Sequence, residues 1–172
     1  MPVQTPISVD EYLRTSFEYD LEYVEGMLEE RKMPTANHAK LLCILAWYLY
    51  SRAKAWNVEV LSDCRIRVSP DRYRIPDISV TIGRGPQPDG PIEVAPLFVI
   101  EILSPDDSLS QLRVKAKEYL GVGVKHVWTV DPTSGECYQH LQRAMVAVED
   151  RILRVDGTDI EIPMAEIFET LR

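Results

Sequence analysis

The chain has 172 residues, of which 45% are hydrophobic and 27% are charged, and it carries a formal net charge of −8 at pH 7. This length suits one domain over residues 1–172, with a core that needs no disulfide or metal support. The negative charge argues against a nucleic-acid partner, because phosphate binding usually draws on an excess of lysine and arginine.

The three cysteines, Cys43, Cys64 and Cys137, are odd in number and far apart. They therefore indicate neither a disulfide framework nor a zinc ribbon, and they suit a reducing cytoplasm. The N-terminus lacks the basic start and apolar run of a secretory signal. Because the longest apolar run, Leu41 to Tyr50, is about half of a membrane span, we expect a cytoplasmic protein with no membrane partner.

The first half of the chain predicts a helix, a hairpin and a second helix. Ser8 and Glu11 form a capping box for a short helix ending near Arg14. Strands are expected at 19–24 and 27–32, with the turn at Glu25-Gly26. Apolar residues at helical spacing predict a buried helix from His38 to about Trp56, with Asn37 as its N-cap.

The second half of the chain predicts a sheet as the core. Strands are expected at 58–61, 66–68, 73–82, 97–103 and 124–130, with a helix over 110–120 before the last of them. The order strand, helix, strand predicts a parallel crossover. Edge strands are expected at 136–141, 144–148 and 160–162, followed by a closing helical turn over 163–168.

Two acids interrupt apolar strands, which is where acids are least expected. Asp77 precedes Ile78-Ser79-Val80, and Glu101 lies within the run from Leu97 to Leu103. Burying an unpaired carboxylate costs several kcal/mol, so the two acids are predicted to share a cation, and a divalent ion is the simplest one. Taken singly, each acid could instead be a solvated strand end or the partner of an arginine.

Basic residues gather near both acids. Arg65, Arg67, Arg72 and Arg74 precede Asp77, and Arg113, Lys115, Lys117 and Lys125 follow Glu101. A local positive field could therefore oppose the negative net charge. The alternative is that these clusters are ordinary solvated faces of a strand pair and a helix.

Five segments in this order resemble the Uma-two family of restriction-endonuclease-like proteins, of the PD-(D/E)XK nuclease superfamily. They are Leu21-Glu22-Tyr23-Val24-Glu25-Gly26, Pro34-Thr35-Ala36-Asn37-His38, Ile75-Pro76-Asp77-Ile78-Ser79, Val99-Ile100-Glu101-Ile102-Leu103-Ser104-Pro105, and Lys115 through Tyr119 with Gly123, Trp128 and Asp131-Pro132. The resemblance implies an α/β (α+β) restriction-endonuclease-like domain. Its mixed central sheet would be flanked by helices, with an N-terminal hairpin and C-terminal edge strands.

The resemblance also implies hydrolysis of phosphodiester bonds, most simply in DNA, with Mg²⁺ or Mn²⁺ as cofactor. Asp77 and Glu101 would be metal ligands and catalytic residues, and the backbone carbonyl of Ile102 would be a third ligand. Mg²⁺ suits such a site because it binds through one or two carboxylates together with a substrate phosphate. Cleavage of two strands would be served by a homodimer.

The chain departs from the superfamily motif at Leu103, where a lysine is expected two residues after Glu101. In the family pattern a lysine on the following helix replaces it, and the match falls on Lys115. On a helical wheel Lys115 lies at one edge of the apolar stripe and Lys117 lies beyond the other edge, so Lys117 is only an accessory candidate. Lys115 could instead extend along the stripe to solvent.

Glu22 and His38 are further accessory candidates because both fall in matching segments. Glu22 could contact the metal directly or through a neighbour, whereas His38 could simply cap or pack in the first turn of its helix. A rival hypothesis is a catalytically inactive nuclease-fold protein that binds nucleic acid or another partner, with its acids neutralised by Arg74 or Lys115. Hydrolysis of a small phosphate ester is a third hypothesis.

Overall fold

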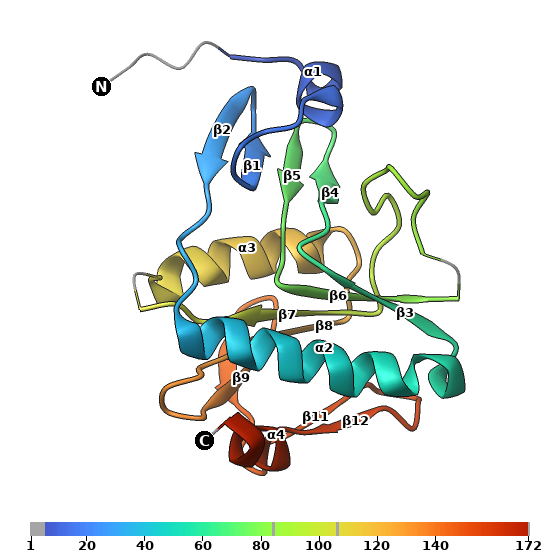
Figure 1. Cartoon of the computed structure of the whole chain (residues 1–172), viewed down its shortest axis with the longest axis vertical. Helices are drawn as coiled ribbons and strands as arrows, with labels where there is room; N and C mark the ends of the chain where they lie inside the picture. The colour runs from blue at the N-terminus through green and yellow to red at the C-terminus, as the bar shows by residue number, and fades with distance from the viewer. Residues whose placement is uncertain (1–5, 84, 106, 172) are drawn as a thin grey trace.

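The computed structural model describes residues 6–83, 85–105 and 107–171 and contains two main sheets (Figure 1). The helices are α1 (Val9–Arg14), α2 (Ala36–Trp56), α3 (Leu109–Gly121) and α4 (Met164–Leu171). The strands are β1 (Leu21–Val24), β2 (Met27–Glu30), β3 (Val58–Ser62), β4 (Ile66–Ser69), β5 (Arg72–Arg74), β6 (Ile78–Ile82), β7 (Phe98–Ile102), β8 (His126–Val130), β9 (Cys137–His140), β10 (Met145–Ala147), β11 (Ile152–Arg154) and β12 (Glu161–Pro163).

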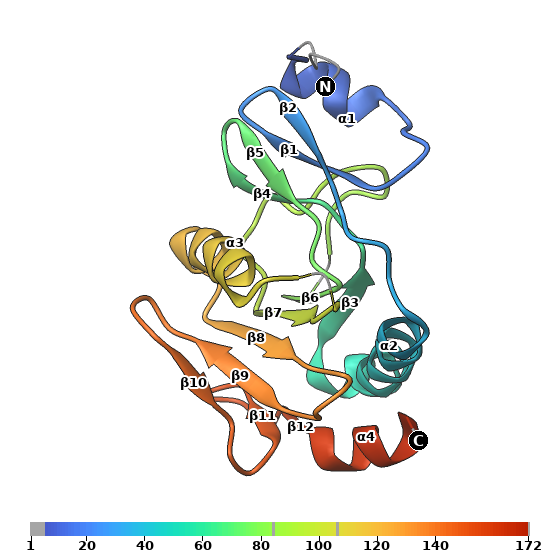
Figure 2. The same cartoon turned by 90° about the vertical axis from the view of Figure 1, so that its left-hand side faces the viewer.

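The larger sheet has six strands in the order β10-β9-β8-β7-β6-β3. It is a mixed sheet, because β7 and β8 are parallel and the other neighbours are antiparallel. The helix between β7 and β8 is α3, which confirms the predicted crossover. Helices α2 and α3 lie on opposite sides of this sheet, as predicted for a central sheet flanked by helices (Figure 2).

Strand β7 is buried on both faces. Its side chains alternate between these faces, so each one packs either toward α2 or toward α3. Phe98, Ile100 and Ile102 belong to the same core cluster as the buried leucines of α2. Val99 belongs to the other cluster, with Tyr119 of α3. Since successive side chains of a strand point to opposite faces, Glu101 shares the α3 face with Val99.

The smaller sheet has four strands in the order β2-β1-β5-β4 and is packed against α1 (Figures 1 and 2). Its core is a cluster of three buried tyrosines, Tyr12, Tyr23 and Tyr73. The predicted hairpin is confirmed as β1 and β2, and its turn residues have positive φ, 52° at Glu25 and 89° at Gly26. Glycine adopts this backbone conformation without a Cβ clash, so the sequence marked the turn correctly.

The structure corrects the strand predicted over residues 73–82. It is divided into β5, in the smaller sheet, and β6, in the larger one, with Ile75-Pro76-Asp77 between them. Proline has no backbone N–H to donate to a strand ladder, so Pro76 ends the pairing. Asp77 therefore lies where the chain passes from one sheet to the other.

Two smaller predictions also need correction. The N-cap of α2 is Thr35, whose hydroxyl accepts from the N–H of His38, and Asn37 is inside the helix. Of the expected C-terminal edge strands, β10 is at the edge of the larger sheet, β9 is inside it, and β12 pairs with the unpredicted β11 in a separate two-stranded sheet. Within the described ranges, no helix has the length and apolar character needed to cross a membrane.

Candidate active site

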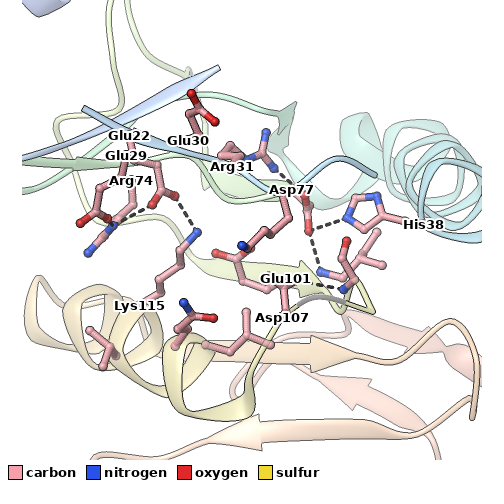
Figure 3. Close-up of a pocket in the computed structure, with 16 residues that line it drawn as sticks. Glu22, Glu29, Glu30, Arg31, His38, Arg74, Asp77, Glu101, Asp107 and Lys115 are labelled. Carbon is pink, nitrogen blue, oxygen red and sulfur yellow. Dashed lines mark hydrogen bonds and ion pairs between the residues drawn. The ribbon is translucent and has the colours of Figure 1, made fainter. Parts of the chain in front are cut away.

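A pocket of about 310 Å³ lies where the two sheets and α3 meet, and charged side chains dominate its wall (Figure 3). The lining residues are Glu22, Glu29, Glu30, Arg31, Lys32, His38, Arg74, Asp77, Glu101, Ile102, Ser104, Asp107, Gln111, Leu112, Val114 and Lys115. The pocket therefore includes all but one of the residues proposed from the sequence. The exception is Lys117, which is exposed on α3 and does not line it.

Asp77 and Glu101 are brought together by the pairing of β6 with β7. Ile78 is the register partner of Ile100, so the residues next to them, Asp77 and Glu101, lie at the same end of the β6–β7 pair. Both side chains line the pocket and both are buried, with the residues at 3% and 6% exposure. The negative charge of Asp77 raises the pKa of Glu101, so the two carboxylates repel each other and a nearby cation would relieve this repulsion.

Asp77 is held by three groups. Its Oδ2 accepts from the Ile102 backbone N–H at 2.7 Å and is 3.3 Å from His38 Nε2. Its Oδ1 accepts from Arg31 Nη2 at 2.6 Å. Burial lowers the pKa of His38, but the hydrogen bond to Asp77 together with the negative charges of Asp77 and Asp63 outweighs burial, and the net shift is upward. His38 thus orients Asp77 from the first turn of α2.

Glu101 is strained electrostatically. Its Oε1 accepts from the Tyr119 hydroxyl at 2.8 Å. Burial raises the pKa of the Glu101 carboxyl to about 7; Lys115 opposes this shift, and the negative charges of Asp77 and Glu22 add to it. A carboxyl whose charge is disfavoured to this degree gains most from a cation placed beside it.

Lys115 reaches into the pocket from α3 and donates to Glu22 Oε1 at 2.8 Å (Figure 3). Burial lowers the pKa of its ammonium group, but Glu101 and Glu22 outweigh burial and raise the pKa above the usual value. The side chain is therefore cationic at neutral pH. It does not extend along the apolar stripe to solvent, since its side chain is only 23% exposed.

Glu22 connects Lys115 to a buried network in the smaller sheet. Glu22 Oε2 accepts from Arg74 Nη1 at 2.7 Å, and its Oε1 also accepts from the Ile75 backbone N–H at 3.2 Å. Arg74 in turn donates to Glu29 at 2.8 Å and to Glu118 of α3 at 2.6 Å. The network thereby fixes α3, and with it Lys115, against the strand that carries Glu22.

Comparisons with known proteins identify a family and a relative of known structure. Residues 9–164 match the family model described as "Uma2: Putative restriction endonuclease". The chain belongs to this family. A crystal structure described as "a putative nuclease belonging to DUF820" from Anabaena variabilis ATCC 29413 is 26% identical, covers 97% of this chain and 100% of its own, and superposes with a TM-score of 0.80. No curated protein matches.

Membership of this family confirms the resemblance and the mixed α+β fold predicted from the sequence, and it supports a nuclease-like function. The sequence did not single out Arg31, the residue that pairs with Asp77. Arg31 is the first residue after β2 and is far from either acid in the sequence, so no local motif points to it. The expected partners, Arg74 and Lys115, both bind Glu22 instead.

The donor atoms of the site fit a magnesium ion held by two carboxylates. Asp77 and Glu101 supply the hard oxygen ligands that Mg²⁺ prefers, and one or two carboxylates are what its sites usually provide. Within the described ranges, no group of three or more His, Cys, Asp or Glu side chains is arranged to hold a metal. A divalent ion would also have to compete with Arg31 for Asp77 Oδ1.

Glu101→Gln is expected to stabilise the protein at pH 8 in EDTA, by roughly 1 to 3 kcal/mol. The folded-state pKa of Glu101, about 7, is above its ordinary value of 4.5, so the folded state retains a proton that the unfolded state releases. Stability is therefore lost as pH rises from about 4.5 to about 7, and the neutral glutamine removes this loss.

Urea denaturation at pH 8 and pH 5 measures this effect, and the gain should be smaller at pH 5. Glu149→Gln is the matched control, because Glu149 is exposed and away from the pocket. A Glu101→Gln protein that is less stable than wild type at pH 8 would show that the carboxylate is not under electrostatic strain.

Proposed function

We propose that the protein is a Mg²⁺-dependent endonuclease that hydrolyses phosphodiester bonds in DNA, with Mn²⁺ as an alternative ion. The observation that carries the proposal is that two buried carboxylates, Asp77 and Glu101, line one pocket together with the cationic Lys115. Family membership and the nuclease-like structural relative support the same class of function.

In this proposal each side chain has a distinct task. Asp77 and Glu101 would hold the ion, together with the backbone carbonyl of Ile102. When bound, the ion supplies the Lewis-acid chemistry that phosphodiester hydrolysis requires. Tyr119 fixes one oxygen of Glu101, and the Ile102 N–H and His38 fix one oxygen of Asp77. Two carboxylates are thus oriented before any ligand arrives, which lowers the cost of binding.

The superfamily motif expects a lysine at the position of Leu103. In this proposal Lys115 replaces that lysine. Its ammonium group lies beside Glu22 and is attracted electrostatically by Glu101. From this position it would orient the attacking water or stabilise the negative charge that develops on the phosphate in the transition state. Glu22 is then the residue that positions Lys115.

The contact between Arg31 and Asp77 favours one rival, a catalytically inactive nuclease-fold protein that binds nucleic acid or another partner. A guanidinium at 2.6 Å already neutralises Asp77, as it would in a protein that had lost its metal. The two functions differ in metal binding, which the inactive protein would not need.

Calorimetric titration with Mg²⁺ and Mn²⁺, together with cleavage assays on duplex DNA, single-stranded DNA and RNA, tests the proposal. We expect metal binding that disappears in Glu101→Gln, and cleavage that requires the metal and stops in EDTA. If wild-type protein binds neither ion and cleaves none of the substrates, the endonuclease proposal fails and the inactive rival stands.

A further inference from the structure

Arg31 is one of four residues, with Glu30, Lys32 and His38, that line both the candidate active-site pocket and a second pocket of about 720 Å³. We propose that Arg31 is an additional substrate-handling residue. Its guanidinium competes with the divalent ion for Asp77 and, once displaced, binds the phosphate of the substrate. This inference rests on the proposed function and adds a residue that no sequence motif indicates.

The guanidinium of Arg31 is shared between carboxylates that differ in burial. Nη2 donates to Asp77 Oδ1 at 2.6 Å, and Nη1 donates to Asp63 Oδ1 at 2.6 Å, with Asp20 Oδ2 3.8 Å away. The side chain of Asp77 is 4% exposed, whereas those of Asp63 and Asp20 are 35% and 65% exposed. Arg31 can therefore release the buried carboxylate and keep a partner nearer to solvent.

Release of Asp77 would disturb little else in the site. Asp77 Oδ2 keeps the Ile102 N–H and His38 as partners, so only Oδ1 changes its contact. Residues 31–35, between β2 and α2, form no helix or strand, so a movement of Arg31 breaks no strand ladder. A dication next to Asp77 would also repel the guanidinium, and this repulsion favours the displaced position.

The displaced guanidinium suits a phosphate better than any other cation of the pocket. Its planar fork can donate two parallel hydrogen bonds to a phosphate, which a lysine cannot do. The other arginine of the pocket, Arg74, is already bound by three glutamates, and its side chain is only 7% exposed. Arg31 is the pocket arginine with a partly exposed side chain, at 18%.

Mn²⁺ titration of wild type, Arg31→Met and Lys32→Met at the same pH tests the competition. Lys32 is the matched control, because it lines the same two pockets, is exposed and carries the same charge. We expect Arg31→Met to bind Mn²⁺ about tenfold more tightly than wild type, which corresponds to about 1.4 kcal/mol. We expect Lys32→Met to change the affinity less than about twofold.

A second titration with a short DNA duplex in Ca²⁺ tests the phosphate contact. Despite its tighter metal binding, Arg31→Met is expected to bind this DNA about tenfold more weakly than wild type. Arg31→Lys keeps the charge but lacks the fork, so it should bind Mn²⁺ as wild type does or slightly more tightly and still bind DNA more weakly. It replaces Arg31→Met if that variant does not fold.

The outcomes separate this inference from the proposed function. If wild-type protein binds Mn²⁺ and Arg31→Met binds it no more tightly than Lys32→Met does, the competition is refuted and the endonuclease proposal stands. If Arg31→Met binds DNA as well as wild type does, Arg31 does not hold the phosphate. If wild type binds no divalent ion, both proposals fail together.

Discussion

Lys115→Met is expected to lower kcat for DNA cleavage by about 10²- to 10³-fold, the usual effect of removing one group that stabilises charge in a transition state. Lys115 is the lysine that α3 directs into the pocket, and the pKa of its ammonium group is raised, so it is fully charged at the pH of the assay. Methionine preserves much of the aliphatic length and removes only the charge and the donors.

The variant should still fold and bind metal. Glu22 keeps Arg74 and the Ile75 N–H as partners when Lys115 is removed, so no buried carboxylate is left unpaired. Mn²⁺ affinity measured by calorimetry should therefore not fall. Removal of a lysine with a purely structural role would not lower kcat while leaving the metal affinity intact.

Lys117→Met is the matched control on the same helix. Lys117 is exposed and outside the pocket, so its removal should change kcat by less than about threefold. If Lys115→Met and Lys117→Met lower kcat equally, Lys115 contributes only to the general electrostatic attraction of DNA. An active Lys115→Met protein would show that the chain does not replace the motif lysine missing at Leu103.

Arg74→Met is expected to destabilise the protein by about 3 to 5 kcal/mol, the usual cost of removing one member of a buried ion pair. Arg74 is 5% exposed and binds Glu22, Glu29 and Glu118, so its loss leaves negative charges that repel one another. The buried Glu22 would retain only Lys115 as a charged partner. The loss should appear as a lower urea midpoint with an unchanged slope.

Two variants determine whether this loss arises from buried charge. Arg154→Met is the control, because Arg154 pairs with Asp150 and Glu161 on the surface, and its removal should cost less than about 1 kcal/mol. Adding Glu22→Gln to Arg74→Met should restore part of the stability, since the unpaired carboxylate is then neutral. A loss below 1 kcal/mol in Arg74→Met would contradict the importance of the network.

Local sequence patterns predicted many of the secondary-structure elements, although the boundaries of several differ. The turn at Glu25-Gly26 and the crossover through α3 were predicted because each depends on residues close together in the chain. The strand expected over residues 73–82 was wrong because Pro76 interrupts it and its two halves join different sheets. Apolar periodicity cannot distinguish one strand from two.

The sequence by itself determined the family, the mixed fold and the presence of two acids within apolar segments, because each is encoded in short contiguous segments. Only the tertiary structure decided that Asp77 and Glu101 line one pocket, that Lys115 binds Glu22, and that Arg31 rather than Arg74 pairs with Asp77. These pairs join residues from separate strands and helices, and long-range register and packing, which no local pattern specifies, bring them together.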